Sequence, residues 1–256
     1  MNPDLTSMVK LASAAAREAG QKLRDRNTEW TNVTSGKHHD LKLSADRQSE
    51  QIILATLQGG SRYPVLSEEA GEIGTPDADG FRWIVDPLDG TVNYRYDLPL
   101  SCVSIALWQG ATPCCGVVYD FCRDELFHAA AGLGAFLNGQ PTGVTATTRQ
   151  DQAIIATGFP VNRDFADDAL RNFIATLQNF RKVRLLGSAA LSLAYVASGR
   201  ADAYHEEDIM LWDVAAGIAL VNAAGGCTSV EMSKRVPNAC RVFAAARPEL
   251  MPSFSP

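Results

Sequence analysis

The sequence contains no uninterrupted apolar run of about 18 residues, the length that a membrane-spanning helix needs. Its first residues alternate charged and apolar side chains at helical spacing, unlike the apolar segment of a secretory signal. Internal repeats and low-complexity segments are also lacking, and the composition, 46% hydrophobic and 20% charged, is that of a globular protein. We therefore expect a globular chain with no membrane partner and no secretory signal.

Paired cysteines and clustered basic residues are lacking too. The six cysteines have neither the spacings of a zinc site nor the density of a disulfide framework, so we expect reduced thiols in a cytoplasmic protein. The 23 Lys and Arg face 29 Asp and Glu, which gives a formal net charge of −6. Nucleic-acid binding is disfavoured because it needs cations that neutralise phosphates. A phosphorylated small molecule can still bind where metal ions supply the positive charge.

What is present is a regular succession of amphipathic segments. Apolar spacing of three and four predicts helices over residues 4–26 and about 45–57, separated by the polar loop GKHHD. Short β-rich segments with turn residues between them follow, and an Asn-Gly pair in GLGAFLNGQP indicates a hairpin. We expect strands in the segments YPVLSEE, FRWIVDP, SCVSIALWQG, PCCGVVYDF and DELFHAA, and a loop in GEIGTPDADG.

Beyond residue 150 strands and helices alternate. Helices are predicted over 165–179, 188–198 and 211–224, with strands in AIIATGF, KVRLL, ADAYHE, GCTSVE and CRVFAAA. A run of strands followed by such alternation predicts a layered α+β fold. We expect one unit over 1–256, with sub-domains of about 1–145 and 146–256 and no long linker between them.

The most informative segment is WIVDPLDGTVNY, where an apolar strand runs into a turn with two carboxylates. Pro87 makes the turn rigid and Gly90 permits close approach of the backbone, so Asp86 and Asp89 can converge. Carboxylates held so close need a cation between them. An isolated Asp-x-x-Asp is usually a polar turn, but the Gly-Thr that follows offers donors to an anion held by a metal. The spacing also differs from the Asp-x-Asp of phosphatases with an aspartyl nucleophile, which favours attack by metal-activated water.

Two further acidic segments fit this interpretation. Ser67-Glu68-Glu69 ends a predicted strand, and Asp213 in WDVAAG opens a predicted helix. An Asp at a helix start is commonly only a cap. Small residues after Asp213 would let that helix end pack tightly against a strand and hold the carboxylate in place.

Together these segments resemble the inositol monophosphatase family, whose pattern is Asp-Pro-Ile/Leu-Asp-Gly-Thr with a later Trp-Asp-x-Ala/Ser-Ala/Gly. The resemblance runs from the first helix to about residue 246 and implies the αβαβα sandwich shared with fructose-1,6-bisphosphatase. It implies two or three Mg²⁺ ions, one held by Glu69, Asp86 and the Leu88 carbonyl, another by Asp86, Asp89 and Asp213. Hard oxygen ligands suit Mg²⁺.

The resemblance also assigns catalytic roles. Asp46 would accept a hydrogen bond from Thr91, whose hydroxyl would orient the water that Glu69 and one metal ion deprotonate. Asp46 alone is equally well explained as a first-turn helix residue. For the substrate, the resemblance implies contacts from Asp89, Gly90, Thr91, Ser188, Ala189 and Glu206, and Arg184 could bind a second phosphate. Ser188 is as readily a helix N-cap.

The expected activity is hydrolysis of a small phosphate monoester, an inositol or sugar monophosphate. The acidic run His205-Glu206-Glu207-Asp208 would repel a second phosphate and would suit histidinol phosphate, whereas Arg184 leaves nucleotide 3'(2'),5'-bisphosphates and fructose 1,6-bisphosphate open. A catalytically silent binding protein and a carboxylate-pair glycosidase are rivals from other classes. The presence of all four acidic side chains of the metal set argues against a silent binding protein. The Gly-Thr turn would have no role in a glycosidase. By resemblance alone we expect a homodimer.

Overall fold

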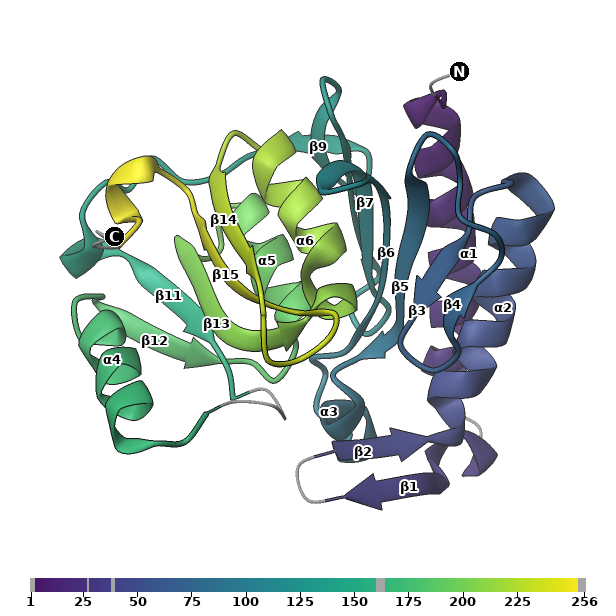
Figure 1. Cartoon of the computed structure of the whole chain (residues 1–256), viewed down its shortest axis with the longest axis horizontal. Coiled ribbons are helices and arrows are strands. Elements are labelled where there is room, and N and C mark those ends of the chain that lie inside the picture. Colours follow the sequence, from purple (N-terminus) through teal and green to yellow (C-terminus); the bar gives the residue numbers. More distant parts are fainter. Residues whose placement is uncertain (1–2, 27, 38–39, 160–163, 253–256) are drawn as a thin grey trace.

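The protein is described by a computed structural model covering residues 3–26, 28–37, 40–159 and 164–252, and it is built in five layers (Figure 1). Helices α1 (Leu5–Asp25) and α2 (Ser44–Gly60) cover one face of the first sheet. Helices α5 (Ala189–Ala197) and α6 (Leu211–Ala223) lie between the two sheets, and α4 (Asp167–Leu177) covers the outer face of the second. The predicted αβαβα sandwich is confirmed.

The first sheet has eight strands in the order β10-β9-β8-β7-β6-β5-β3-β4. Neighbours are antiparallel except β3 and β5, which run parallel and therefore end at the same edge. The strands are β3 (Val65–Ser67), β4 (Gly71–Ile73), β5 (Phe81–Asp89), β6 (Cys102–Gln109), β7 (Thr112–Asp120), β8 (Glu125–Ala130), β9 (Gly134–Leu137) and β10 (Gln140–Thr142). The short helix α3 (Thr91–Arg95) follows β5 directly.

The second sheet is mixed, with the order β12-β11-β13-β15-β14. Its strands are β11 (Ile154–Thr157), β12 (Lys182–Leu185), β13 (Ala203–Met210), β14 (Cys227–Met232) and β15 (Ala239–Ala245). A separate hairpin pairs β1 (Val33–Lys37) with β2 (Asp40–Leu43), and single 3₁₀ turns span Thr28–Thr31, Gln150–Gln152 and Pro248–Leu250.

Strand alternation divides the buried residues of the first sheet between its two faces. On β6, Val103, Ile105 and Leu107 pack into the cluster with α1 and α2, whereas Ala106 packs toward α5 and α6. Helix α1 approaches the sheet closely because Ala12, Ala15, Ala16 and Ala19 form its buried face. Each face of the sheet thus has its own core, and the second face carries the site.

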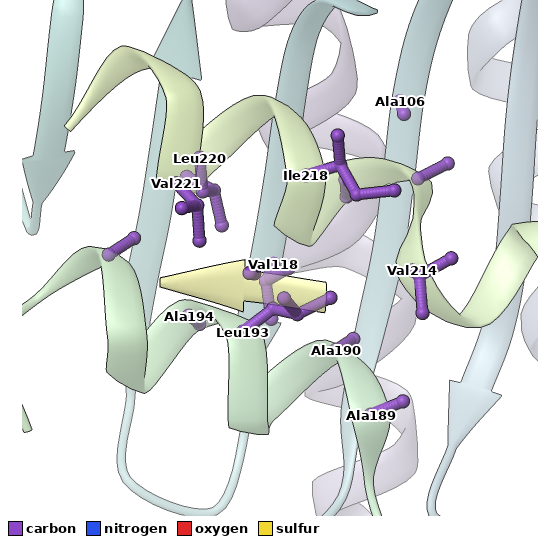
Figure 2. Close-up of a cluster of buried hydrophobic side chains, with 14 of the residues drawn as sticks. Ala106, Val118, Ala189, Ala190, Leu193, Ala194, Val214, Ile218, Leu220 and Val221 are labelled. Atoms are coloured by element: carbon purple, nitrogen blue, oxygen red, sulfur yellow. The ribbon is translucent and has the colours of Figure 1, made fainter. Parts of the chain in front are cut away.

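The central helix layer depends on small residues. Figure 2 shows Leu193 of α5 and Ile218 and Val221 of α6 packed together with Val118 of the first sheet. A Cβ on Gly217 would lie 2.3 Å from Leu193 Cβ, and one on Gly116 of β7 would lie 2.4 Å from the Ala216 carbonyl oxygen. These two glycines let α6 fit between β7 and α5.

The helices and the main strands lie where the sequence predicts them, with ends shifted by a few residues. The predicted hairpin turn at Asn138-Gly139 is confirmed, since both residues have positive φ, 49° and 78°. Two expected loops are wrong in part. Strands β1 and β2 extend into the GKHHD segment, residues 36–40, of which 38–39 lie outside the described residues, and β4 lies within GEIGTPDADG. These short edge strands are too polar to show apolar alternation. No helix among the described residues is long and apolar enough to cross a membrane.

We predict that Gly116→Ala lowers the free energy of unfolding by roughly 1–3 kcal/mol, because the added Cβ meets the backbone of α6, which cannot rotate away. Denaturant unfolding followed by circular dichroism measures this. Gly59→Ala is the matched control, since its Cβ would meet nothing within 4 Å and it lies in helix α2. Equal stabilities of Gly116→Ala and wild type would contradict the close contact between β7 and α6.

Candidate metal centre and active site

The Asp-Pro-Leu-Asp segment lies at the end of β5 and contains a β-bulge. Asp86 pairs with Ser104 of β6, but Asp89 pairs with Cys102, so three steps along β5 match two along β6. Residues three apart on a regular strand point to opposite faces, and the bulge cancels this alternation. Asp86 and Asp89 therefore both face the α5 and α6 layer, whereas Leu88 packs among the side chains under α1 and α2.

Three carboxylates from three elements converge at this edge. Oxygens of Glu68, Asp86 and Asp213 all lie within 4.8 Å of one another. Glu68 directly follows β3, Asp86 is in β5, and Asp213 is in the first turn of α6. Because β3 and β5 are parallel, their ends deliver Glu68 and Asp86 to the same place. An all-oxygen set of this kind fits a hard divalent cation.

The structure corrects the choice between the two adjacent glutamates. The family resemblance implied Glu69 as a metal ligand, but Glu68 is the glutamate that lies with Asp86 and Asp213. The Glu69 carboxylate pairs instead with the Lys42 ammonium, at 2.6 Å. Consecutive side chains after a strand point in different directions, so only one of the two can face the cluster.

Asp89 is held by the start of α5. Its Oδ2 accepts hydrogen bonds from the Ser188 hydroxyl at 2.5 Å and from the Ala190 N–H at 2.8 Å. Ser188 also accepts a hydrogen bond from the Leu191 N–H, so it is the N-cap of α5 and at the same time a support for Asp89. Gly90 is required next to it, because its φ is 86° and a Cβ would lie 2.6 Å from the Leu100 carbonyl oxygen.

The predicted pair of Asp46 and Thr91 is in contact. The Thr91 hydroxyl lies 3.0 Å from Asp46 Oδ1 and 3.0 Å from the Leu88 carbonyl oxygen, the two acceptors for its single proton. Asp46 Oδ2 accepts from the Leu43 N–H at 2.7 Å. Asp46 thus caps helix α2 and binds Thr91 with its other oxygen, so both interpretations of Asp46 from the sequence hold at once.

Helix α2 supports the site with further polar side chains that the sequence analysis did not single out. Ser49 donates to the Pro87 carbonyl at 2.7 Å, and Glu50 accepts from the Ser67 hydroxyl and from the Ala70 N–H. These contacts join the first two turns of α2 to β5, to β3 and to the turn that follows β3. The signal was present in the sequence, since Asp46, Ser49 and Glu50 are spaced by three and four residues on one helix face.

Burial and mutual repulsion raise the carboxyl pKa values of the cluster. Burial is the main cause at Glu68, whose pKa rises to about 8, and at Asp86 and Asp213, whose pKa values lie well above the usual range. Repulsion from Glu68 adds to the rise at Asp86 and Asp213, and repulsion from Asp46 and Glu69 adds to the rise at Glu68. The pKa of Asp89 also rises, to about 6, through burial, although hydrogen bonds from Ser188 and Ala190 oppose this. Such a cluster holds either protons or a cation.

The second sheet contributes Glu206, buried on the face of β13 that looks toward the helices. Gly158 leaves room for it, since a Cβ there would lie 2.5 Å from Glu206 Oε1. The Tyr204 hydroxyl is buried on the same face with no hydrogen-bond partner among the described residues. Burial and the charges of Glu206, Asp213 and Asp89 raise its pKa. The sequence analysis did not identify Tyr204.

The rest of the acidic run does not face the cluster. The expectation that the whole run would repel a second phosphate is therefore wrong for Glu207 and Asp208. His205 contacts Phe243 on the outer face, 5.4 Å between ring centroids, and the Glu207 carboxylate lies 3.8 Å from the His205 ring nitrogen. Asp208 pairs with Arg235. Arg184 is exposed on the edge strand β12 and donates to the Val183 carbonyl at 3.0 Å. It is separated from Tyr204 by strand β11.

Fold, site and relatives define an enzyme that hydrolyses phosphoric monoesters. The model of the inositol monophosphatase family matches residues 4–255. An inositol-1-monophosphatase of Synechocystis is 41% identical over 234 residues, which cover 88% of this chain and 79% of that protein. The Nus factor SuhB of Escherichia coli K12 is 38% identical over 227 residues, covering 87% and 84%. The structure of an Anabaena inositol monophosphatase superposes with a TM-score of 0.82 at 36% identity, covering 96% and 92%. The chain belongs to the inositol monophosphatase family.

We predict that the metal-free protein loses stability as pH rises from about 5 to about 8. The unfolded chain titrates its carboxyls near pH 4, whereas the folded cluster still holds protons up to pKa values of about 6 to 8. The folded state binds more protons in this window, so the free energy of unfolding falls with rising pH. Thermal unfolding in a chelator measures this, and added Mg²⁺ should remove most of the decline. A flat or rising profile in the chelator contradicts the crowded cluster.

Proposed function

We propose that the protein hydrolyses a small phosphate monoester, an inositol or sugar monophosphate, with Mg²⁺ as its cofactor. The observation that carries this proposal is the convergence of Glu68, Asp86 and Asp213 beside the Asp89-Gly90-Thr91 turn. Oxygen ligands favour Mg²⁺ over softer metals. The backbone N–H groups that follow Asp89 could bind an anion.

The metal would be held as two or three ions by this set. Glu68, Asp86 and the Leu88 carbonyl would bind one ion, and Asp86, Asp89 and Asp213 a second. Glu68 replaces Glu69 in this assignment because its oxygens lie with those of Asp86 and Asp213. Bound there, Mg²⁺ would neutralise phosphoryl oxygens and acidify a water molecule.

The chain's own residues then position the water and the ester. The Thr91 hydroxyl donates its hydrogen bond to Asp46 or to the Leu88 carbonyl, so its oxygen would be left to accept a hydrogen bond from the attacking water. Glu68, whose carboxylate lies with those of Asp86 and Asp213, would be the acceptor of the water's proton. The N–H groups of Gly90 and Thr91 would bind the phosphate.

Glu206 is the proposed contact for the organic half of the substrate. It is buried next to Gly158 and electrostatically close to Asp213, so a hydroxyl-rich group next to the bound phosphate would meet its carboxylate. A single facing carboxylate suits a polyol and also the ammonium of histidinol phosphate. Bisphosphates are less well supported, because Arg184 lies on an edge strand. Ser188 and Ala189 act on the substrate through Asp89 in this proposal.

We also infer a homodimer in the cytoplasm. Large apolar side chains are exposed on α3 and just after it, after β11, before α4 and at the end of β12, and these segments lie on one side of the molecule (Figure 1). They are Val92, Leu98, Phe159, Phe165 and Leu185. A second copy covering this side would bury them. The six free cysteines agree with a reducing compartment. Light scattering would report the mass of the assembly against 27.6 kDa for one chain.

A screen of phosphate esters with Mg²⁺ tests the activity, and Glu206→Gln tests the substrate class. We expect Glu206→Gln to lower kcat/KM for the preferred polyol phosphate. The loss of transition-state stabilisation should be roughly 1–3 kcal/mol, because a charged hydrogen bond to substrate is lost. The kcat/KM for an aryl phosphate should fall much less, because that ester has no hydroxyl or ammonium group for the Glu206 carboxylate to bind. Equal losses on both esters would assign Glu206 to the metal site or the fold, and full turnover in excess chelator would overturn the metal requirement.

Two isosteric changes separate the adjacent glutamates. Glu68→Gln should lower kcat/KM by on the order of 10²-fold or more and raise the Mg²⁺ concentration needed for half-maximal activity, because it removes ligand charge without changing volume. Glu69→Gln should cost less than about tenfold, because its carboxylate pairs with Lys42. Steady-state kinetics over a range of Mg²⁺ concentrations measures both. The reverse order of effects would return the ligand role to Glu69.

A further inference from the structure

A lysine reaches the carboxylate cluster from the β1–β2 hairpin. The Lys42 ammonium lies 2.6 Å from Glu69 Oε1 and 3.9 Å from Glu68 Oε1. Glu68 is one of the three carboxylates that converge within 4.8 Å. Lys42 therefore places a fixed positive charge next to the proposed metal ligands.

The local sequence fixes this position. Leu41 and Leu43 on either side of Lys42 both pack into the core under α1 and α2, and Leu43 is fully buried. On a strand, the residue between two inward side chains points the other way. The Leu43 N–H also donates to Asp46, which ties the end of β2 to helix α2. Lys42 thus faces Glu68 and Glu69 from a backbone anchored on both sides.

The charges explain what such a lysine does. Oxygens of Glu68, Asp86 and Asp213 lie within 4.8 Å of one another, so a cation next to any of them reduces their mutual repulsion. Less repulsion then remains for a further cation to relieve. An ammonium is a compact point charge with three donors and needs no coordination geometry. At 2.6 Å from Glu69 and 3.9 Å from Glu68, it offsets negative charge at both carboxylates.

We propose that Lys42 is a built-in cation of the metal centre. Its ammonium occupies the place of one metal ion on the Glu68 and Glu69 side, so the protein binds one divalent ion fewer than its carboxylates would otherwise hold. The inference rests on the proposed metal site. It concerns the number of ions and their affinity, not whether the enzyme is active.

The experiment counts Mn²⁺ ions bound per chain to the whole protein in the absence of substrate, from the electron paramagnetic resonance signal of the free ion. We expect Lys42→Met to bind one ion more per chain than the wild type, because Glu68 and Glu69 lose their partner. Lys42→Arg should keep the wild-type count. Lys10→Met is the matched control, since Lys10 is an exposed lysine in the N-terminal half of α1.

A second readout is the unfolding temperature, measured without metal and then with saturating Mn²⁺. In excess chelator, Lys42→Met should have a lower unfolding temperature than Lys10→Met, and saturating Mn²⁺ should narrow that gap because the added ion replaces the ammonium. The same ion count and the same affinities in wild type and Lys42→Met would overturn the proposal.

Two other outcomes are informative. If Lys42→Met leaves metal binding unchanged but weakens inhibition by inorganic phosphate roughly tenfold or more, Lys42 binds the phosphate and the proposal is overturned in favour of that role. If the wild type binds no Mn²⁺ at all, both this proposal and the metal-dependent function fail. Failure of the inference alone is thus distinct from failure of the function.

Discussion

Repulsion among buried carboxylates is the constraint on which the site depends. Glu68, Asp86, Asp89 and Asp213 would not stay together in the absence of compensation, because burial and mutual charge both favour the protonated forms. The fold compensates with the positive ends of helices. Asp46 and Asp213 lie in the first turns of α2 and α6, and Asp89 accepts from the first turn of α5. A bound cation would relieve the repulsion that these helix ends leave uncompensated.

The central helix layer connects this strain to the stability of the whole protein. Helices α5 and α6 pack against both sheets, and each presents its N-terminus to the cluster. Their approach depends on Gly116 and Gly217, far from any reacting group. Packing in this layer therefore sets the positions of Asp89 and Asp213, and substitutions in the core are expected to act on catalysis through these two carboxylates.

The sequence allowed the fold to be predicted, and it singled out Asp86 and Asp213 of the carboxylate cluster and the contact of Asp46 with Thr91. The Asp-Pro-Leu-Asp-Gly-Thr segment and the Trp-Asp helix start carry strong local signals, and helix spacing predicted α1, α2 and α6 closely. The choice between Glu68 and Glu69 could not be made, because it depends on how the chain leaves the three-residue strand β3. Lys42 was missed because β1 and β2 lack apolar alternation outside Leu41 and Leu43. The acidic run of β13 was misjudged, since alternation sends His205 and Glu207 to the outer face.

Because of the bulge in β5, the number of residues between Asp86 and Asp89 matters more for the site than which residues they are. Pro87 and Leu88 contribute a rigid turn and a core contact, roles that other side chains can fill in part. Removing one residue would restore regular pairing with β6 and turn one of the two aspartates toward α1 and α2, into an apolar core with no cation to meet it. Substitutions of Pro87 or Leu88 would be graded in effect, whereas an insertion or deletion between the two aspartates would separate them in one step.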